Sequence, residues 1–255
     1  MANTIFDNKI IEAKAKDLLE TKVNTRSYMT VDTSLALEPG MTKTINVYTY
    51  TGEAEELANG EGNTVEGALS FVGTDYKVKR VQSNFFYTDD DFMADNSVVD
   101  NGVEGATNEL KNKMNADFFA ECEKATLSVP GTLGYDTIVD AIAKLNLEDE
   151  SGVFVVIPTA EKATLRKDED YKTARMGEVV YGGQVGQVCG IPVVASNAAK
   201  GAYVMTKDAV KLFLKKDVSA GTDRDENTTK NSVFVRAYYI AALVDNTKIC
   251  KIVTE

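Results

Sequence analysis

The sequence of 255 residues contains no histidine. Catalytic triads that use an imidazole as the general base need this residue, and so does every metal site with an imidazole ligand. The absence therefore excludes both classes of site, and with them a large part of hydrolase and zinc-enzyme chemistry.

Cysteine and long apolar runs are also scarce. Cys122, Cys189 and Cys250 stand far apart, which suggests neither a disulfide framework nor a CxxC metal site, so we expect buried thiols in a reducing compartment. No apolar run approaches the ~18 residues that a membrane span needs. Residues 1–20 lack the apolar core of a secretory signal. We expect a soluble protein that is neither exported nor bound to a membrane.

Positive charge is in deficit, with 28 basic side chains against 39 acidic ones and a net charge of −11. A chain so charged gains little from counterion release when it contacts nucleic acid, and no basic stripe interleaved with aromatic residues stands out. We expect no tight or sequence-specific binding of DNA by the bulk surface. A local basic patch formed by the fold remains compatible with this composition.

The first 90 residues have the pattern of an arm followed by a ribbon. Aliphatic residues at helical spacing predict an amphipathic helix over about 4–21, and extended chain then leads to a Pro-Gly turn. TKTINVYTY (42–50) alternates as a strand does, and GALSFVG and DYKVKRVQSNFFY return after an acidic, glycine-rich loop. We expect a ribbon of two or three strands. Neither arm nor ribbon has an obvious core, and isolated hairpins are marginally stable, so both should pack on something else.

The remaining sequence predicts a compact α+β unit. Apolar residues every three or four positions indicate a long amphipathic helix over 98–127. Asp136 is a candidate N-cap for the next helix, and VFVVI (153–157) has the continuous apolar pattern of a central strand. Further expected elements are a short helix over 158–165, a polar loop over 166–183, and strands at 191–195, 202–205, 210–214 and 232–244.

Three polar segments invite a ligand-binding interpretation. Gly183, Gly186 and Gly190 are spaced GxxGxxxG before an apolar strand, whereas a phosphate loop needs GxGxxG or GxxxxGK[ST] before a helix, so we expect a structural turn. TDDDFMAD and DRDENTTKN carry clustered carboxylates, but counted from Asp223 the sixth and twelfth positions are not the Gly and Glu of an EF-hand. A solvated loop or a helix N-cap is the favoured interpretation of both.

Taken in order, these segments resemble the major capsid proteins of tailed bacteriophages, the Hong Kong ninety-seven fold. Each motif is degenerate, and the specificity lies in their order, which spans nearly the whole chain and which a bacterial encapsulin shell protein would share. The stretches that carry the likeness are TKTINVYTY through KVKRVQSNFFYTDDDF, MNADFFAECEKAT, FVVIPTAEKATLRKDEDY, GQVCGIPVVASN, AYVMTKDAVKLFLKKDVSA and VRAYYIAALVDNTKICKI.

The resemblance implies an α+β fold made of four parts. These are an N-terminal arm, an extended β-ribbon loop, a peripheral domain with a long spine helix, and an axial α/β domain. The closing strands, 232–253, would return to the peripheral region. The implied ranges are 1–39 for the arm, 40–88 for the loop, 89–131 and 226–255 for the peripheral domain, and 132–225 for the axial domain.

The resemblance also implies a structural, non-enzymatic role without a cofactor. Members of the family assemble through hexamers and pentamers into an icosahedral shell around double-stranded DNA, in a virion capsid that is built in the host cytoplasm. They lay the extended loop over a neighbouring subunit, which covers its apolar face, so we expect the arm and the ribbon to become ordered only by lying across other copies of the chain. The expected partners are therefore other copies of the chain, with scaffolding, portal and decoration proteins beside them. The expected inter-subunit contact residues are Tyr48, Tyr50, Glu53, Glu55, Glu56, Leu57, Glu61, Val65, Leu69 and Phe71.

Two departures from the family and two alternatives complete the expectations. Some members crosslink the subunits of the shell covalently through a lysine of the extended loop. No lysine stands between Lys43 and Lys77 in this sequence, so we do not expect this crosslink. The chain begins almost directly with the arm, so any scaffold is expected as a separate protein. An encapsulin-type compartment is the alternative within the same fold. A small cytosolic enzyme or calcium-binding module is the alternative of another class.

Overall fold

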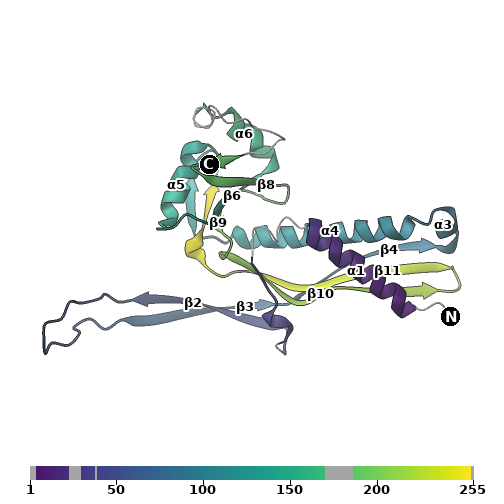
Figure 1. Ribbon diagram of the computed structural model, residues 1–255, viewed down its shortest axis with the longest axis horizontal. Coiled ribbons are helices and arrows are strands. Elements are labelled where there is room, and N and C mark those ends of the chain that lie inside the picture. Colours follow the sequence, from purple (N-terminus) through teal and green to yellow (C-terminus); the bar gives the residue numbers. More distant parts are fainter. Residues whose placement is uncertain (1–3, 23–29, 38, 170–185, 254–255) are drawn as a thin grey trace.

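The computed structural model describes residues 4–22, 30–37, 39–169 and 186–253 (Figure 1). The helices are α1 (Thr4–Lys22), α3 (Asp89–Ala94), α4 (Val98–Cys122), α5 (Tyr135–Leu145) and α6 (Lys162–Lys167), with 3₁₀ turns η1 (Ser34–Ala36), η2 (Thr159–Glu161) and η3 (Asn246–Lys248). The strands are β1 (Thr30–Asp32), β2 (Thr42–Thr51), β3 (Ala68–Lys77), β4 (Lys79–Thr88), β5 (Leu127–Pro130), β6 (Val153–Pro158), β7 (Gln187–Val188), β8 (Ile191–Ser196), β9 (Ala202–Thr206), β10 (Val210–Asp225), β11 (Lys230–Leu243) and β12 (Ile249–Val253).

These strands form two sheets and a ribbon. One sheet has the order β1-β10-β11-β4, the other has the order β5-β12-β9-β6-β8-β7, and β2 pairs with β3 alone. Helices pack on both sheets, so the predicted α+β class is confirmed.

The long helix α4 packs along one face of the four-stranded sheet. Its buried stripe includes Val103, Leu110 and Phe118, which share a core cluster with Val235 and Tyr239 of β11. The predicted spine helix is confirmed, although it ends at Cys122 rather than near 127. The polar side chains of α4 lie mostly on its other faces, as expected for an amphipathic helix.

The arm helix α1 packs on its own chain. It contacts both α4 and β10, and the fully buried Ala15 belongs to the same core cluster as the spine helix. The expected helix is confirmed, but the expectation that the arm finds no core within its own subunit is wrong for this part of it.

The six-stranded sheet explains the unbroken apolar run of β6. Val155 and Ile157 face the cluster that contains Ile138 of α5, while Phe154 and Val156 face the cluster of the α4 C-terminus. Since side chains alternate between faces, a strand covered on both sides must be apolar throughout. The predicted central strand is confirmed.

Strand pairing moves several of the expected domain boundaries. Residues 79–88 were assigned to the extended loop, but β4 pairs with β11 along its length, so the ribbon has two strands and ends at Lys77. β10 falls in the range expected for the axial domain but lies in the four-stranded sheet. β5 and β12 fall in the ranges expected for the peripheral domain but lie in the six-stranded sheet. Alternating apolar residues identify a strand, but they do not identify its partner.

The N-terminus of α5 is capped differently from the prediction. The N-cap position is Gly134, and Asp136 lies within the first turn. The Tyr135 N–H donates to Oδ2 of Asp168 at 2.6 Å, so the capping carboxylate comes from a residue 33 positions away. A Cβ at Gly134 would stand 2.8 Å from that oxygen, so the glycine leaves room for the carboxylate.

The glycine-rich stretch is a hairpin turn, as predicted. β7 and β8 pair across Cys189 and Gly190, whose φ angles of 51° and 82° are both in the left-handed region that such turns require. Cys189 is exposed there, which contradicts the expectation that all three thiols are buried, whereas Cys122 and Cys250 are buried. Gly183 and most of the predicted polar loop lie outside the described residues.

The buried carboxylate of Asp117 connects the spine helix α4 to the four-stranded sheet. Asp117 of α4 is 8 % exposed, accepts a hydrogen bond of 2.8 Å from the Tyr239 hydroxyl, and lies 3.2 Å from the ammonium groups of Lys79 and Lys113. Burial disfavours the ionised form, but the hydrogen bonds from Tyr239 and the lysines together with their charges outweigh it. The pKa of Asp117 therefore lies below its ordinary value of 3.8.

We predict that part of the acid sensitivity of the fold arises at Asp117. Because its pKa is lowered by folding, its stabilising contribution is complete above the unfolded-state pKa and is lost as the pH falls through the folded-state value, below 3.8. Asp117→Asn keeps the Tyr239 hydrogen bond and removes the charge. Urea titrations across pH 2–6 should show a shallower acid decline for Asp117→Asn, and parallel curves for the two proteins would contradict this origin.

Candidate inter-subunit contact surface

The ribbon projects away from the rest of the subunit (Figure 1). β2 and β3 pair in antiparallel register from Thr42 opposite Lys77 to Thr51 opposite Ala68. Ten residues at ~3.4 Å each make the paired part about 34 Å long. Two strands without a covering layer cannot bury an apolar face. The positions of the apolar side chains therefore show which part of the ribbon has to be covered by another element or another molecule.

The root of the ribbon packs on its own subunit. Leu35 and Ile45 are buried in a small cluster with Phe213 and Ile240 of the four-stranded sheet. The ammonium group of Lys43 lies 4.5 Å from the centroid of the Phe213 ring. The expectation that the ribbon lacks any intramolecular core is therefore wrong for the root of the ribbon. The same expectation still applies to the strands beyond Ile45.

Beyond the root, apolar side chains are exposed on both faces. Tyr48 pairs with Phe71 and Tyr50 with Leu69, and these four side chains are 60–67 % exposed. The rings of Tyr48 and Phe71 lie 5.9 Å apart between centroids. Val72 is 71 % exposed on the opposite face. Contiguous exposed apolar patches of this kind mark interaction surfaces.

Two glycines shape the end of the paired strands. A Cβ added to Gly52 or Gly67 would overlap the ring of Tyr50. The absence of side chains at both positions lets this ring lie across the place where the strands open into the loop. The glycines thereby fix where the aromatic surface ends and the acidic tip, residues 52–67, begins.

The acidic tip has internal hydrogen bonds. The Thr64 N–H donates to the Glu55 carboxylate at 2.6 Å, and the Thr64 hydroxyl donates to its other oxygen. These hydrogen bonds lower the pKa of Glu55 below its ordinary value. Glu55 is therefore half-buried within the tip, although it was predicted as a contact residue.

The other predicted contact residues of the tip are exposed. Glu53, Glu56, Leu57, Glu61 and Val65 all present their side chains to solvent. No lysine or arginine stands between Lys43 and Lys77, so the tip carries an uncompensated negative charge. Val47 and Val72 of the paired strands are exposed as well and were not among the predicted residues, although their alternation along the strands was visible in the sequence.

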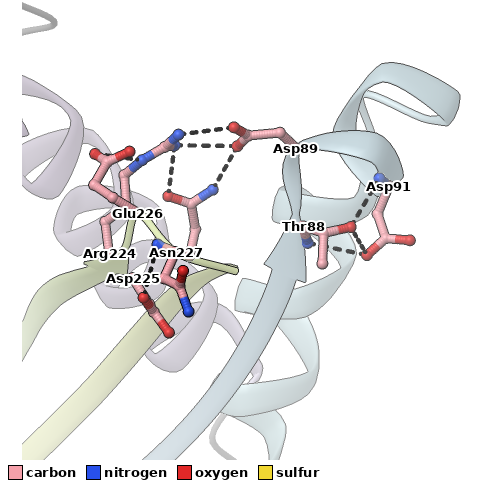
Figure 2. A network of polar contacts seen from close by, with 8 residues as sticks. Thr88, Asp89, Asp91, Arg224, Asp225, Glu226 and Asn227 are labelled. Carbon is pink, nitrogen blue, oxygen red and sulfur yellow. Dashed lines mark hydrogen bonds and ion pairs between the residues drawn. The ribbon is translucent and has the colours of Figure 1, made fainter. Parts of the chain in front are cut away.

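The two aspartate-rich segments meet at the far end of the four-stranded sheet (Figure 2). The guanidinium of Arg224 donates to both oxygens of Asp89 at 2.8 and 3.1 Å, and the Asn231 amide donates to Asp89 at 2.9 Å. Arg224 and Asn231 hold the pKa of Asp89 below its ordinary value. This cluster joins the β10-β11 hairpin to the start of α3.

Three further aspartates of the two segments, Asp91, Asp95 and Asp225, accept hydrogen bonds from nearby backbone N–H groups. Thr88 caps α3, accepting from the Asp91 N–H at 3.2 Å, while Asp91 accepts from the Thr88 N–H at 3.0 Å (Figure 2). Asp225 accepts from the Asn227 N–H at 3.0 Å within the hairpin turn. The favoured N-cap interpretation is confirmed for the first segment.

Among the described helices, none is long and apolar enough to cross a membrane.

Comparison with known proteins identifies the relatives of this architecture. A curated major capsid protein of Staphylococcus phage phiMR11 is 27 % identical over 247 residues, covering 92 % of this chain and 88 % of the relative. The capsid structure of cyanophage P-SCSP1u has a TM-score of 0.69 at 11 % identity, covering 89 % of this chain and 86 % of that one. A virus-like particle from Pyrococcus furiosus has a TM-score of 0.67 at 9 % identity, covering 97 % and 99 %.

The similar structures show that the fold is shared, and the match to a protein family shows that the sequences are related. Residues 71–252, which run from the ribbon to the last strand, match the phage capsid protein family. The resemblance read from the order of the sequence segments is thus confirmed. The chain belongs to the phage capsid protein family.

Proposed function

We propose that this chain is the major capsid protein of a tailed phage and that it assembles through hexamers and pentamers into an icosahedral shell around double-stranded DNA. The family match and the phage relative support the shell-forming, structural role. The observation that carries the proposal is the ribbon, because its aromatic side chains Tyr48, Tyr50 and Phe71 are 60–67 % exposed on the subunit. Within a shell, the ribbon would be covered by a neighbouring copy.

The proposal assigns the ten predicted contact residues to that neighbour. Nine of them are exposed, and Glu55 would contribute by holding the tip in shape. Every subunit that joins the assembly brings both its ribbon and its own surface close to further neighbours, which raises their effective concentration. Scaffolding, portal and decoration proteins would be separate partners, and assembly would take place in the host cytoplasm.

An encapsulin-type compartment is the second candidate function. It is supported by the similarity to the virus-like particle from Pyrococcus furiosus, which covers 97 % of this chain. The phage relative and the family match favour the capsid role. The contents of particles purified from cells distinguish the two, because a capsid holds DNA and a compartment holds a protein cargo.

Electron microscopy of the recombinant protein tests the assembly role. We expect closed shells or capsomer rings, either spontaneously or after addition of a scaffolding protein from the same phage. A dispersed subunit that stays monomeric at high concentration in both conditions would contradict the proposed function. Mass photometry of the same samples would follow the intermediate rings.

A further inference from the structure

The ribbon joins the rest of its subunit through a short segment. β3 ends at Lys77 and β4 begins at Lys79, so Val78 alone separates the ribbon from the four-stranded sheet. The Val78 N–H donates to the Met41 carbonyl at 2.8 Å and links the two chains where they enter and leave the ribbon. We call residues 76–79 the pivot segment, because the backbone of this segment sets the direction in which the ribbon projects (Figure 1).

A small change of angle at the pivot segment moves the far end of the ribbon a long way. The paired strands are about 34 Å long, so a tilt of about 10° displaces their far end by roughly 6 Å. Such a displacement is about twice the length of a hydrogen bond. The exposed aromatic side chains of the ribbon therefore keep a defined position only if other contacts fix this angle.

Two buried carboxylates of α4 face the pivot segment. Asp117 and Glu121 are four residues apart, so they lie on the same face of the helix. Oδ1 of Asp117 lies 3.2 Å from the ammonium group of Lys79, at the sheet end of the pivot segment. Glu121 faces the hydroxyl of Tyr76 at the ribbon end, and burial together with this carboxylate raises the pKa of Tyr76. One helical turn thus contacts both ends of the pivot segment.

Each carboxylate also has a lysine partner on or next to its own helix. The Lys113 ammonium group lies 3.2 Å from the same Asp117 oxygen, and that of Lys124 lies 2.7 and 2.8 Å from the two oxygens of Glu121. The Lys124 ammonium group also lies 5.7 Å from the centroid of the Tyr76 ring. A buried carboxylate is costly unless it is paired and hydrogen-bonded. Since these lysines supply part of that pairing, the contacts made by the pivot segment serve to connect it with the helix.

The apolar root of the ribbon constrains the angle less strictly. Val78 packs on the small cluster that contains Phe213 and Ile240. Because Tyr239 faces α4 and side chains alternate along a strand, this cluster lies on the opposite face of the sheet. Hydrophobic contacts are non-directional, whereas hydrogen bonds weaken steeply as their angle changes. A tilt that preserves the apolar contacts would therefore still break the contact of Lys79 with the helix.

We propose that Asp117 and Glu121 are positioning residues, which set the direction of the ribbon by holding Lys79 and Tyr76 against the spine helix. Both contacts are intramolecular, so the ribbon is directed before a second copy is present. The consequence for assembly rests on the proposed function, because a ribbon that already has its binding direction loses less conformational entropy when it meets a neighbour. Preorganisation of this kind raises affinity without any added contact between subunits.

Distances between two spin labels in isolated subunits test the positioning role. One label is placed on the native Cys189, which is exposed, and the other on Ser70→Cys in β3, while the other two thiols are buried and stay unlabelled. Lys79→Met removes the contact between the pivot segment and Asp117, so we expect a wider distribution of distances than in the native subunit. Lys79→Arg keeps a cation within reach of Asp117 and should restore the native distribution.

Lys113→Met is the matched control, because Lys113 lies at the same distance from the same oxygen of Asp117 but belongs to α4. It makes the same chemical change and leaves the pivot segment in contact, so its distribution should match that of the native subunit. Tyr76→Phe removes the hydroxyl that faces Glu121 and should widen the distribution. A native distribution for either folded pivot variant, or equal widening in Lys113→Met, would overturn the proposal.

Assembly is measured on the same variants by mass photometry, and circular dichroism verifies that each variant is folded. Lys79→Met should need at least about threefold more protein than the native chain to form rings, and Lys113→Met should assemble like the native chain. Equal ring formation by Lys79→Met and the native chain would overturn the consequence for assembly. Native subunits that form no rings would contradict the proposed function, while the distances between the labels would still decide whether the spine helix directs the ribbon.

Discussion

A variant that lacks residues 53–66 is expected to fold normally and to form no shells. The deletion joins Gly52 directly to Gly67 between Thr51 and Ala68, which are paired in the native ribbon. Two glycines are well suited to the tight turn that links antiparallel strands, since both central residues need positive φ. The removed segment contributes no residue to the buried core, so the thermal midpoint should change by no more than a few degrees.

The loss of shells would follow from the loss of the tip contacts. Electron microscopy at protein concentrations that give native shells is the measurement. Replacing residues 53–66 by a glycine- and serine-rich segment of equal length separates contact from length, and it should fail in the same way. Shells of native appearance from the deletion variant would show that the tip has no part in assembly.

The sequence predicted those elements whose pattern is local. The continuous run of β6, the stripe of α4 and the alternation of TKTINVYTY each reflect a constraint within a few neighbouring residues. A strand with helices over both faces has to be apolar at every position, and an exposed ribbon can keep polar residues between its apolar ones. These elements lie where they were expected.

Contacts between distant segments were not predictable from the sequence in the same way. The pairing of β4 with β11 joins residues that are about 150 positions apart, and nothing in KVKRVQSNFFY distinguishes a third ribbon strand from a sheet edge. The cap of α5 is similar, because the sequence places Asp136 near the helix start, whereas the fold brings Asp168 to it. In both cases the deciding interaction is tertiary.

The proposed contact surface could be predicted only in part, for the same reason. The exposed aromatic and acidic residues of the ribbon could be identified because they stand in one continuous stretch without a basic residue. By contrast, which residues of β4, β10 and β11 share one face of the four-stranded sheet is known only from the strand register. Arg80 and Arg236, for example, stand far apart in the chain, but the register places them on the same face.

Replacing Phe119 by alanine is expected to cost about 3–5 kcal/mol of the free energy of unfolding. Phe119 is fully buried near the C-terminus of α4, stacks on Tyr203 of the six-stranded sheet with centroids 6.0 Å apart, and meets Phe118 edge to face at 5.1 Å. The cavity left behind would border the rings of Phe118 and Tyr203, and the well-packed core around it could collapse only in part. Typical domains have ~5–15 kcal/mol in total, so the loss takes a large share of the stability.

Two control variants isolate the packing effect in denaturant titrations. Phe119→Leu keeps most of the volume and should cost roughly 1.5 kcal/mol or less, and Phe92→Ala on the surface helix α3 should cost less than about 1 kcal/mol. A loss at Phe119→Ala no larger than at Phe92→Ala would contradict the role of this ring. Since the core cluster around Phe119 includes Val156 of one sheet and Val235 of the other, the weakened protein should still unfold in a single transition.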